Sequence, residues 1–147
     1  MKVLVQQAPF DFGAEAEAFA RAQHNMGAVV TFTGIVRDSV EGGMAEMQIE
    51  HYPGMTEKAL TQFAQDAMDR FDLGDALVIH RYGHLGRDEM IMMVATAARH
   101  RKDAFAAAEY MMDWLKSRAP FWKKEVGDTG AQWVDARDED EDALSRW

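Results

Sequence analysis

Two pairs of strand-like segments, separated by an amphipathic helix, limit the fold of this chain more than any other feature. The first pair begins with GAVVTFTGIVR (27–37), which is dense in β-branched residues and carries Val30, Phe32 and Val36 on one face. MAEMQIEHY (44–52) follows after DSVEGGM, a stretch with the composition of a turn. We expect a buried strand and a second strand antiparallel to it.

The second pair is ALVIHRY (76–82) and MIMMVATAA (90–98), joined by GHLGRDE (83–89), which also has turn composition. Between the two pairs, from Thr56 onward, apolar residues recur with a period of about 3.6, which predicts an amphipathic helix. The residues of this apolar stripe are Leu60, Phe63, Ala64, Ala67, Met68 and Phe71.

Two further helices are predicted. The stretch AEAEAFARAQHN (14–25) is rich in alanine and glutamate and predicts a surface helix. Asp103 is expected to cap a third helix, which Pro120 stops because proline lacks an amide donor and disfavours helix at the preceding residue. The apolar stripe of this third helix is Ala104, Ala108, Met111 and Leu115.

Strand pairs alternating with helices predict an α+β fold in which helices pack on a largely antiparallel sheet. A short strand over AQWVD (131–135) and a solvated acidic tail, DARDEDED (135–142), are expected after the third helix. At 147 residues, of which 48% are hydrophobic, the chain suits one compact domain over residues 1–147.

Composition excludes several classes of function. The chain has no cysteine, which rules out disulfides, thiolate metal sites and a cysteine nucleophile. It shows no apolar run of the roughly 18–20 residues that span a bilayer and no signal-peptide core, so we expect a cytoplasmic protein. A net charge of −9 argues against a general nucleic-acid binder.

Positive charge is nevertheless concentrated in one region. Residues 99–124 hold seven lysines and arginines against three acidic residues, a local net charge of +4. Such a basic region in an acidic protein suits a small anion or one acidic partner. His100 and Arg101 precede the third helix, where free amides and the helix dipole favour an anion. On these residues alone, solvated loop charges are the simpler interpretation.

The segment SRAPFWKKE (117–125) is the second part of this basic region. A lysine near a helix C-terminus commonly interacts favourably with the negative end of the helix dipole, and this accounts for Lys116. It does not account for Phe121 and Trp122, since large aromatic side chains after a helix need something to cover them. A lysine held against such a surface can have its pKa lowered, which would make it usable as a proton shuttle or an amine nucleophile.

Other signals are weaker. His80 and His84 have the spacing i, i+4, but on a strand and a turn this does not place both on one face, so a structural or surface role is expected. The eleven methionines are expected mainly to fill gaps in the core, with a partner-binding surface as the lesser alternative. Neither a metal site nor a nucleotide-binding or hydrolase motif is present, and no cofactor is expected.

Six motifs, in this order, resemble those of the large, catalytic subunit of molybdopterin synthase, over a region from about Ala28 to Trp147. They are FTGIVR (32–37), IEHYPGMTEKAL (49–60), VIHRYGHL (78–85), HRKDAF (100–105), MDWLKSRAPFWKKE (112–125) and WVDAR (133–137). The resemblance implies an α/β hammerhead fold and a homodimer. It implies that each protomer binds a small ubiquitin-like subunit whose Gly-Gly C-terminus is a thiocarboxylate, giving a heterotetramer.

The implied activity is that of a sulfurtransferase in molybdenum cofactor biosynthesis. The partner's tail would deliver sulfur to cyclic pyranopterin monophosphate, and two transfers would make the dithiolene of molybdopterin. The absence of cysteine agrees with this, because the partner carries the sulfur.

The resemblance also implies roles for individual residues. Lys116 and Lys123 match the family's essential pocket lysines, with Lys116 at the thiocarboxylate carbonyl and in proton transfer, and Lys123 stabilising negative charge or assisting as acid or base. Pro120, Phe121 and Trp122 would form a rigid apolar wall of the pocket that receives the partner's tail.

The remaining matches concern the pterin. Arg37, His100 and Arg101 correspond to anion-binding residues that would hold its phosphate, Arg137 to a further pocket arginine and Met112 to a pocket-lining methionine. In this family residues of both protomers form each pocket. The main alternatives are a non-catalytic module that binds a ubiquitin-like tail and a phosphate- or nucleotide-binding protein.

The sequence departs from the family pattern in two places. GRDE follows Leu85 where a glycine more often precedes the acidic pair, and an apolar Ile35 stands where relatives can have a basic residue. The second change is expected to weaken the local positive field while leaving Arg37 in place.

Overall fold

The computed structural model describes residues 1–39, 42–128, 130–134 and 137–147. In chain order the elements are β1 (Lys2–Gln6), α1 (Phe12–Arg21), β2 (Ala28–Ile35), β3 (Met44–His51), α2 (Met55–Phe71), β4 (Asp75–Arg81), β5 (Gly83–Gly86), β6 (Met90–Ala98), α3 (Arg101–Ser117), β7 (Phe121–Gly127), β8 (Gly130–Val134) and α4 (Asp138–Leu144). The predicted α+β class is confirmed.

The described strands form two four-stranded sheets. The first sheet has the order β1-β4-β6-β2, with β1 parallel to β4 and the other pairs antiparallel. The second sheet has the order β5-β3-β7-β8 and is antiparallel throughout. The prediction that β3 pairs with β2 is wrong, because β2 pairs along its length with β6 while β3 pairs with β5 and β7.

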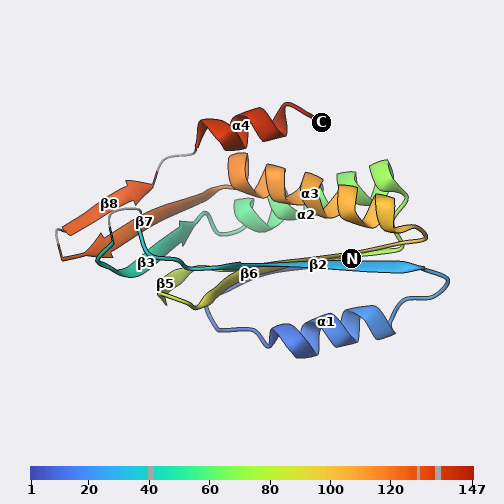
Figure 1. The fold of residues 1–147 in the computed structure, drawn as a ribbon, viewed down its shortest axis with the longest axis horizontal. Coiled ribbons are helices and arrows are strands. Elements are labelled where there is room, and N and C mark those ends of the chain that lie inside the picture. Colours follow the sequence, from blue (N-terminus) through green and yellow to red (C-terminus); the bar gives the residue numbers. More distant parts are fainter. Residues whose placement is uncertain (40–41, 129, 135–136) are drawn as a thin grey trace.

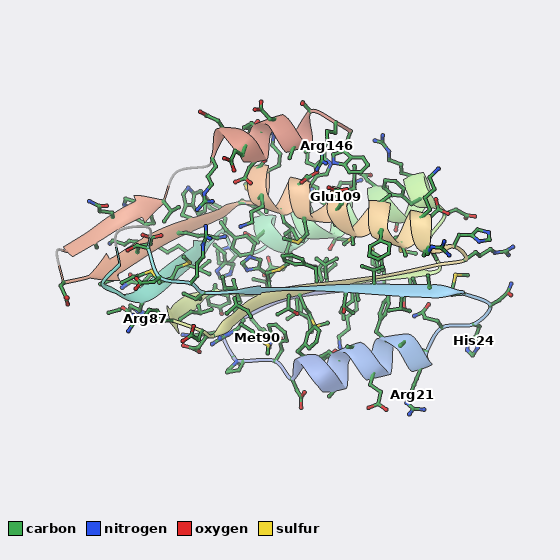
Figure 2. All side chains as sticks on the ribbon, viewed as in Figure 1. Arg21, His24, Arg87, Met90, Glu109 and Arg146 are labelled. Atoms are coloured by element: carbon green, nitrogen blue, oxygen red, sulfur yellow. The ribbon has the colours of Figure 1, made fainter. Side chains whose placement is uncertain are left out.

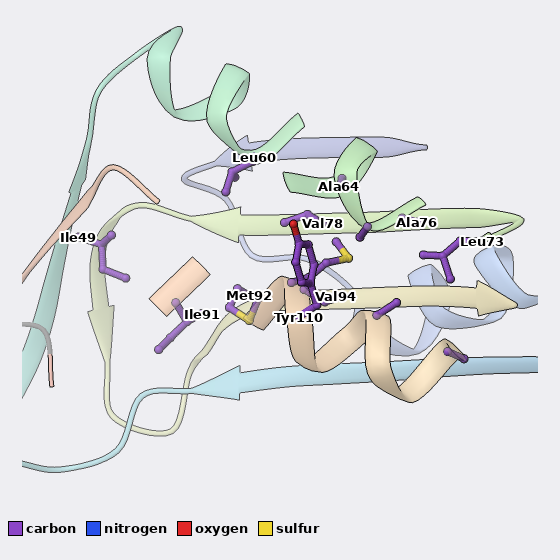
Figure 3. Close-up of a cluster of buried hydrophobic side chains, with 14 of the residues drawn as sticks. Ile49, Leu60, Ala64, Leu73, Ala76, Val78, Ile91, Met92, Val94 and Tyr110 are labelled. Carbon is purple, nitrogen blue, oxygen red and sulfur yellow. The ribbon is translucent and has the colours of Figure 1, made fainter. Parts of the chain in front are cut away.

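Helices cover both faces of the first sheet, with α1 on one side and α2 and α3 on the other (Figure 1). Because successive side chains of a strand point to opposite faces of the sheet, the strands of the first sheet contribute side chains to two hydrophobic cores. Val78 and Val94 pack toward α2 and α3 in the larger cluster, part of which is shown in Figure 3, whereas Leu77 and Met93 pack with Phe19 of α1. Since both faces are covered, β6 is buried almost throughout.

Several elements differ from the sequence-based expectation. β1 was not predicted, and the stretch expected to be only a turn at 83–89 contains β5. Phe121 and Trp122 open strand β7 instead of lying in a loop, and α4 forms within the expected acidic tail. The predicted turn at 38–44 includes residues 40–41, and the strand predicted over 131–135 ends at Asp135; these three residues lie outside the described part of the chain.

Two side chains lie elsewhere than predicted. Phe32 was expected on a buried face but is 42% exposed, because β2 is an edge strand of the first sheet. Asp103 lies within the first turn of α3, whose N-cap is His100, so it does not cap the helix. Among the described residues, no helix combines the length and apolar character needed to cross a membrane.

Candidate active site

A cavity of about 400 Å³ lies where the end of β2, the end of β4, the last turn of α3, β7 and the start of α4 meet. Charged side chains of both signs line it, namely Arg37, Asp38, Lys116, Lys123, Glu125, Arg137 and Asp140. A smaller cavity of about 90 Å³ shares His80, Lys116 and Lys123 with the first and adds Phe32 and Met112. The fold thus gathers six of the predicted site residues around one hollow region, namely Arg37, Met112, Lys116, Phe121, Lys123 and Arg137.

The two lysines reach this region from different elements. Lys116 lies in the last turn of α3, where a positive charge is favourable, and is exposed. Lys123 lies on β7, and strand alternation places it on the same face as Phe121 and Glu125, all three of which line the larger cavity. Burial, and then the positive charge of Lys116, lower the pKa of Lys123 from 10.5 to about 8. Lys123 is therefore partly an uncharged amine near neutral pH.

His80 is a cavity residue for which the sequence-based expectation was only a structural or surface role. It lines both cavities, it is only 4% exposed, and its ring stacks on Phe121 with centroids 3.8 Å apart. Burial, and then the charge of Lys123, lower the pKa of His80 from 6.5 to about 3, with a smaller contribution from Lys116. One feature of the sequence could have identified His80 as a cavity residue: it ends the apolar run ALVIH, which marks a buried position next to a strand end.

Arginines and carboxylates complete the larger cavity. Arg37 follows β2, and Arg137 is the N-cap residue of α4. Hydrogen bonds from the Met44 and Ser39 amides, together with the nearby guanidinium of Arg87, hold the pKa of Asp38 below its usual range. The larger cavity thus offers cations that can bind an anionic group of a ligand and carboxylates that can accept hydrogen bonds from the ligand.

Two residues of the predicted apolar wall lie outside both cavities. Trp122 is on the opposite face of β7 from Lys123, 47% exposed and 6.3 Å from the ring of Tyr52. The carbonyl of Pro120 accepts a hydrogen bond from Thr56 Oγ1 at 3.0 Å, which ties the start of β7 to α2. Of the three predicted wall residues, only Phe121 faces the cavity.

His100 and Arg101 lie at the far end of α3 from Lys116. At 1.5 Å per residue, the 15 residues between Arg101 and Lys116 correspond to about 23 Å. The structure therefore does not bring the two parts of the basic region together within one chain. No group of three or more histidine, aspartate or glutamate side chains that could hold a metal ion occurs in the described residues.

Comparisons with known proteins agree on one family. The family model described as MoaE protein matches residues 5–118. The molybdopterin synthase catalytic subunit of Cereibacter sphaeroides is 63% identical over 147 residues, which is 100% of both chains. The molybdopterin biosynthesis MoaE protein of Burkholderia ambifaria has a TM-score of 0.85 and 47% identity over 99% of this chain and 97% of that one.

A more distant structure, the complex of subunits 1 and 2 of the molybdopterin-converting factor from Helicobacter pylori, has a TM-score of 0.73. At 20% identity over 92% of this chain and 91% of that one, it shows the shared fold alone.

Proposed function

Because this chain belongs to the MoaE family and has the activity of the molybdopterin synthase catalytic subunits, we propose that sulfur transfer takes place in the cavity between Lys116 and Lys123. The observation that carries this assignment is the pair of lysines itself. One is an exposed cation at a helix end, and the other has a pKa of about 8 and lines the same cavity. A proton acceptor and a fixed positive charge are the groups that acyl and sulfur transfer need.

The substrate of the proposed reaction is cyclic pyranopterin monophosphate. Arg37 and Arg137 are suited to its phosphate because a guanidinium can donate two parallel hydrogen bonds. Asp38 and Asp140 can accept hydrogen bonds from N–H groups of the pterin.

The sulfur donor is a thiocarboxylate at the Gly-Gly end of a small ubiquitin-like partner. Its sulfur displaces an oxygen substituent from a substrate carbon: a C–S bond forms, the C–O bond at that carbon breaks, and the oxygen leaves with a proton, giving a thioester-like intermediate. Water then attacks the carbonyl carbon of the tail, the bond between this carbonyl carbon and sulfur breaks, and the tail leaves as a carboxylate while sulfur stays on the substrate. We place the reaction in the cytoplasm, where a reducing environment protects such sulfur groups.

The environments of the two lysines favour a division of roles. Lys123, with a pKa of about 8, can accept the proton of the attacking water at neutral pH and return it. Lys116 carries the positive charge that stabilises the oxyanion developing on the tail carbonyl. Proton transfer is thus assigned to Lys123, whereas the family resemblance alone assigned it first to Lys116.

A second copy of the chain would complete the site with His100 and Arg101. Ala28 of β2 pairs with Ala98, two residues before His100, while the opposite end of β2 leads to Arg37. A two-fold axis near the middle of this edge strand would bring the His100 end of one protomer to the Arg37 end of the other. The β2 edge has the exposed apolar side chains expected of such a contact, with Val29, Phe32 and Ile35 at 37%, 42% and 54% exposure.

The assembly that follows is a homodimer carrying one small partner per protomer. The tail of each partner would reach the lysines along Phe121, the aromatic residue of the cavity wall. The Helicobacter pylori structure that shares this fold is itself a complex of two different subunits.

Substitution of the lysines tests the proposal. Purified Lys116→Ala and Lys123→Ala are mixed with thiocarboxylated partner and cyclic pyranopterin monophosphate, and molybdopterin is measured as its fluorescent oxidation product. We expect a loss of at least about 100-fold in turnover for each, the usual size of an acid–base or oxyanion contribution, with partner binding retained.

The matched control is Lys124→Ala, since Lys124 is the next residue of β7, faces the other side of the strand and lies over the ring of Trp133. It should keep turnover near that of the unsubstituted protein. Undiminished product from Lys116→Ala would refute the assignment. A complex with the partner that yields no product even in the unsubstituted protein would instead identify a non-catalytic module that binds the tail.

A further inference from the structure

His80 occupies the point where the two sheets meet beside the lysines. It lies near the end of β4, two residues after Val78, so strand alternation points it to the α2 and α3 side of the first sheet. There it lines both cavities together with Lys116 and Lys123.

The ring of His80 connects the sheets directly. It stacks on Phe121 of the second sheet with an interplanar angle of 19°. Phe121 and Lys123 lie two residues apart on β7 and share its cavity face. The stack therefore fixes the part of β7 from which Lys123 extends.

A hydrogen bond fixes the orientation and the protonation of the same ring. Nδ1 lies 2.8 Å from the carbonyl oxygen of Arg81, and since a carbonyl only accepts, Nδ1 carries the proton and donates it. The neutral imidazole then has no proton on Nε2. A neutral ring adds no third positive charge to the two lysines that flank it.

We propose that His80 is a positioning residue for Lys123: its ring, held by Phe121 and the Arg81 carbonyl, closes the cavity wall behind the lysine and excludes water from it. This inference rests on the proposed function of the cavity, because it explains how Lys123 becomes a usable base. Desolvation is the largest cause of the lowered pKa of Lys123, so the side chains that exclude water from it determine how much amine is present.

The test is a titration of Lys123 in three proteins without substrate or partner. Each is labelled with acetic anhydride over a range of pH, and acetylation of the peptide containing Lys123 is followed by mass spectrometry. In the unsubstituted protein half-maximal reactivity is expected near pH 8. His80→Phe keeps an aromatic ring against Phe121 and should leave the midpoint within about half a unit, because the wall stays dry.

His80→Ala opens the wall and should raise the midpoint by one unit or more. The amine fraction of Lys123 at pH 7 and turnover at that pH then fall by roughly tenfold per unit. Phe121→Ala, which removes the stacking partner, should shift the midpoint in the same direction and serves in place of His80→Ala if that protein does not fold. Lys124 in the same samples is the internal control, and its titration should be identical in all proteins.

The proposal is overturned if the midpoint of Lys123 is unchanged in folded His80→Ala, or in Phe121→Ala where this variant replaces it. It is also overturned if the midpoint rises equally in His80→Phe and His80→Ala. A purely structural role would lower thermal stability without moving the titration. The labelling needs no catalysis, so its outcome is independent of the proposed function. If the midpoints move as expected while Lys123→Ala retains turnover, the positioning stands and the role of Lys123 as the base fails.

Discussion

At the residue scale, the proposed site has a buried histidine that must stay neutral beside two lysines. Most buried polar groups in proteins are paired, and His80 pairs through Nδ1 with a backbone carbonyl. Charging the ring would require a second proton on Nε2 in a desolvated position near Lys116 and Lys123. Protonation of His80 therefore opposes the folded state.

This predicts a specific dependence of stability on pH. The unfolded chain protonates His80 as the pH falls through about 6.5, whereas the folded chain does so only near 3, so in this window the unfolded state binds more protons. The free energy of unfolding should fall as the pH falls, by up to about 1.4 kcal/mol per pH unit from this group. His80→Phe lacks this contribution.

Urea unfolding at pH 6.5 and pH 5 measures the effect. Relative to His80→Phe, the free energy of unfolding of the unsubstituted protein should fall by up to about 2 kcal/mol from pH 6.5 to pH 5. His24→Gln changes an exposed histidine that follows α1 (Figure 2) and lines neither cavity, and it should follow the unsubstituted protein. If the free energy of unfolding depends on pH in the same way in His80→Phe and in the unsubstituted protein, the ring of His80 titrates normally in the folded state.

Sequence reasoning found the cations of the cavity but missed its carboxylates and the ring of His80 beside the lysines. Lys116 and Lys123 stand out because lysines beside aromatic residues and a proline are unusual after a helix. His80 does not, because its importance comes from Phe121, which is 41 residues away in sequence and belongs to the other sheet. A contact of this kind has no local pattern.

At the element scale, the least predictable parts of the site are β7 and α4. β7 forms because β3 offers it a pairing edge, and this depends on the division of the chain into two sheets. α4 has seven residues, too few for a stable isolated helix, and four acidic residues in its first turn. Its sequence alone therefore predicts a solvated tail, and tertiary contacts hold it as a helix.

Those contacts gather at the end of the chain. Trp147 meets Phe71 and Tyr110 edge-on at 5.8 and 5.5 Å between centroids, and its Nε1 donates to Asp113 at 2.6 Å. Arg146 pairs with Glu109 at 2.9 Å, as Figure 2 shows above α3. These contacts hold α4 across α3 and so place Arg137 and Asp140 at the cavity.

Trp147→Ala should therefore loosen α4 while leaving the sheets intact. Loss of two edge-on aromatic contacts and a hydrogen bond is expected to cost about 2 kcal/mol, and amides of residues 138–144 should exchange with deuterium roughly tenfold faster or more. Turnover should fall as well, because Arg137 and Asp140 are no longer held in place. Trp133→Ala, at a tryptophan that is 53% exposed on β8, is the control and should leave exchange in α4 unchanged. Equal protection of α4 in both variants would show that other contacts hold it.

At the scale of the whole molecule, the fold separates two groups of cations that the sequence places in one basic region. The α+β class could be predicted because the strand pairs and amphipathic helices have clear periodicities. The division into two sheets could not, since strand pairing over long sequence separations is not encoded in any local segment. As a result, α3 holds Lys116 at one end and Arg101 at the other.

The proposed sharing of each site between two protomers predicts complementation. Lys116→Ala and Arg101→Ala, each with its own affinity tag, are co-expressed, and mixed dimers are isolated with both tags in turn. If Arg101 acts across the dimer, one of the two sites in a mixed dimer is intact while the other carries both changes, so activity should recover to about half that of the unsubstituted dimer.

Mixed dimers of Lys116→Ala with Lys123→Ala are the matched control. Both lysines line the cavity of a single chain, so neither site is complete and no recovery is expected. The prediction requires that Arg101→Ala homodimers be impaired, with the defect mainly in the KM for the pterin, as loss of a phosphate contact implies. Recovery no greater than in the control dimers would place Arg101 outside the partner's site and leave the charge at the start of α3 without a catalytic role.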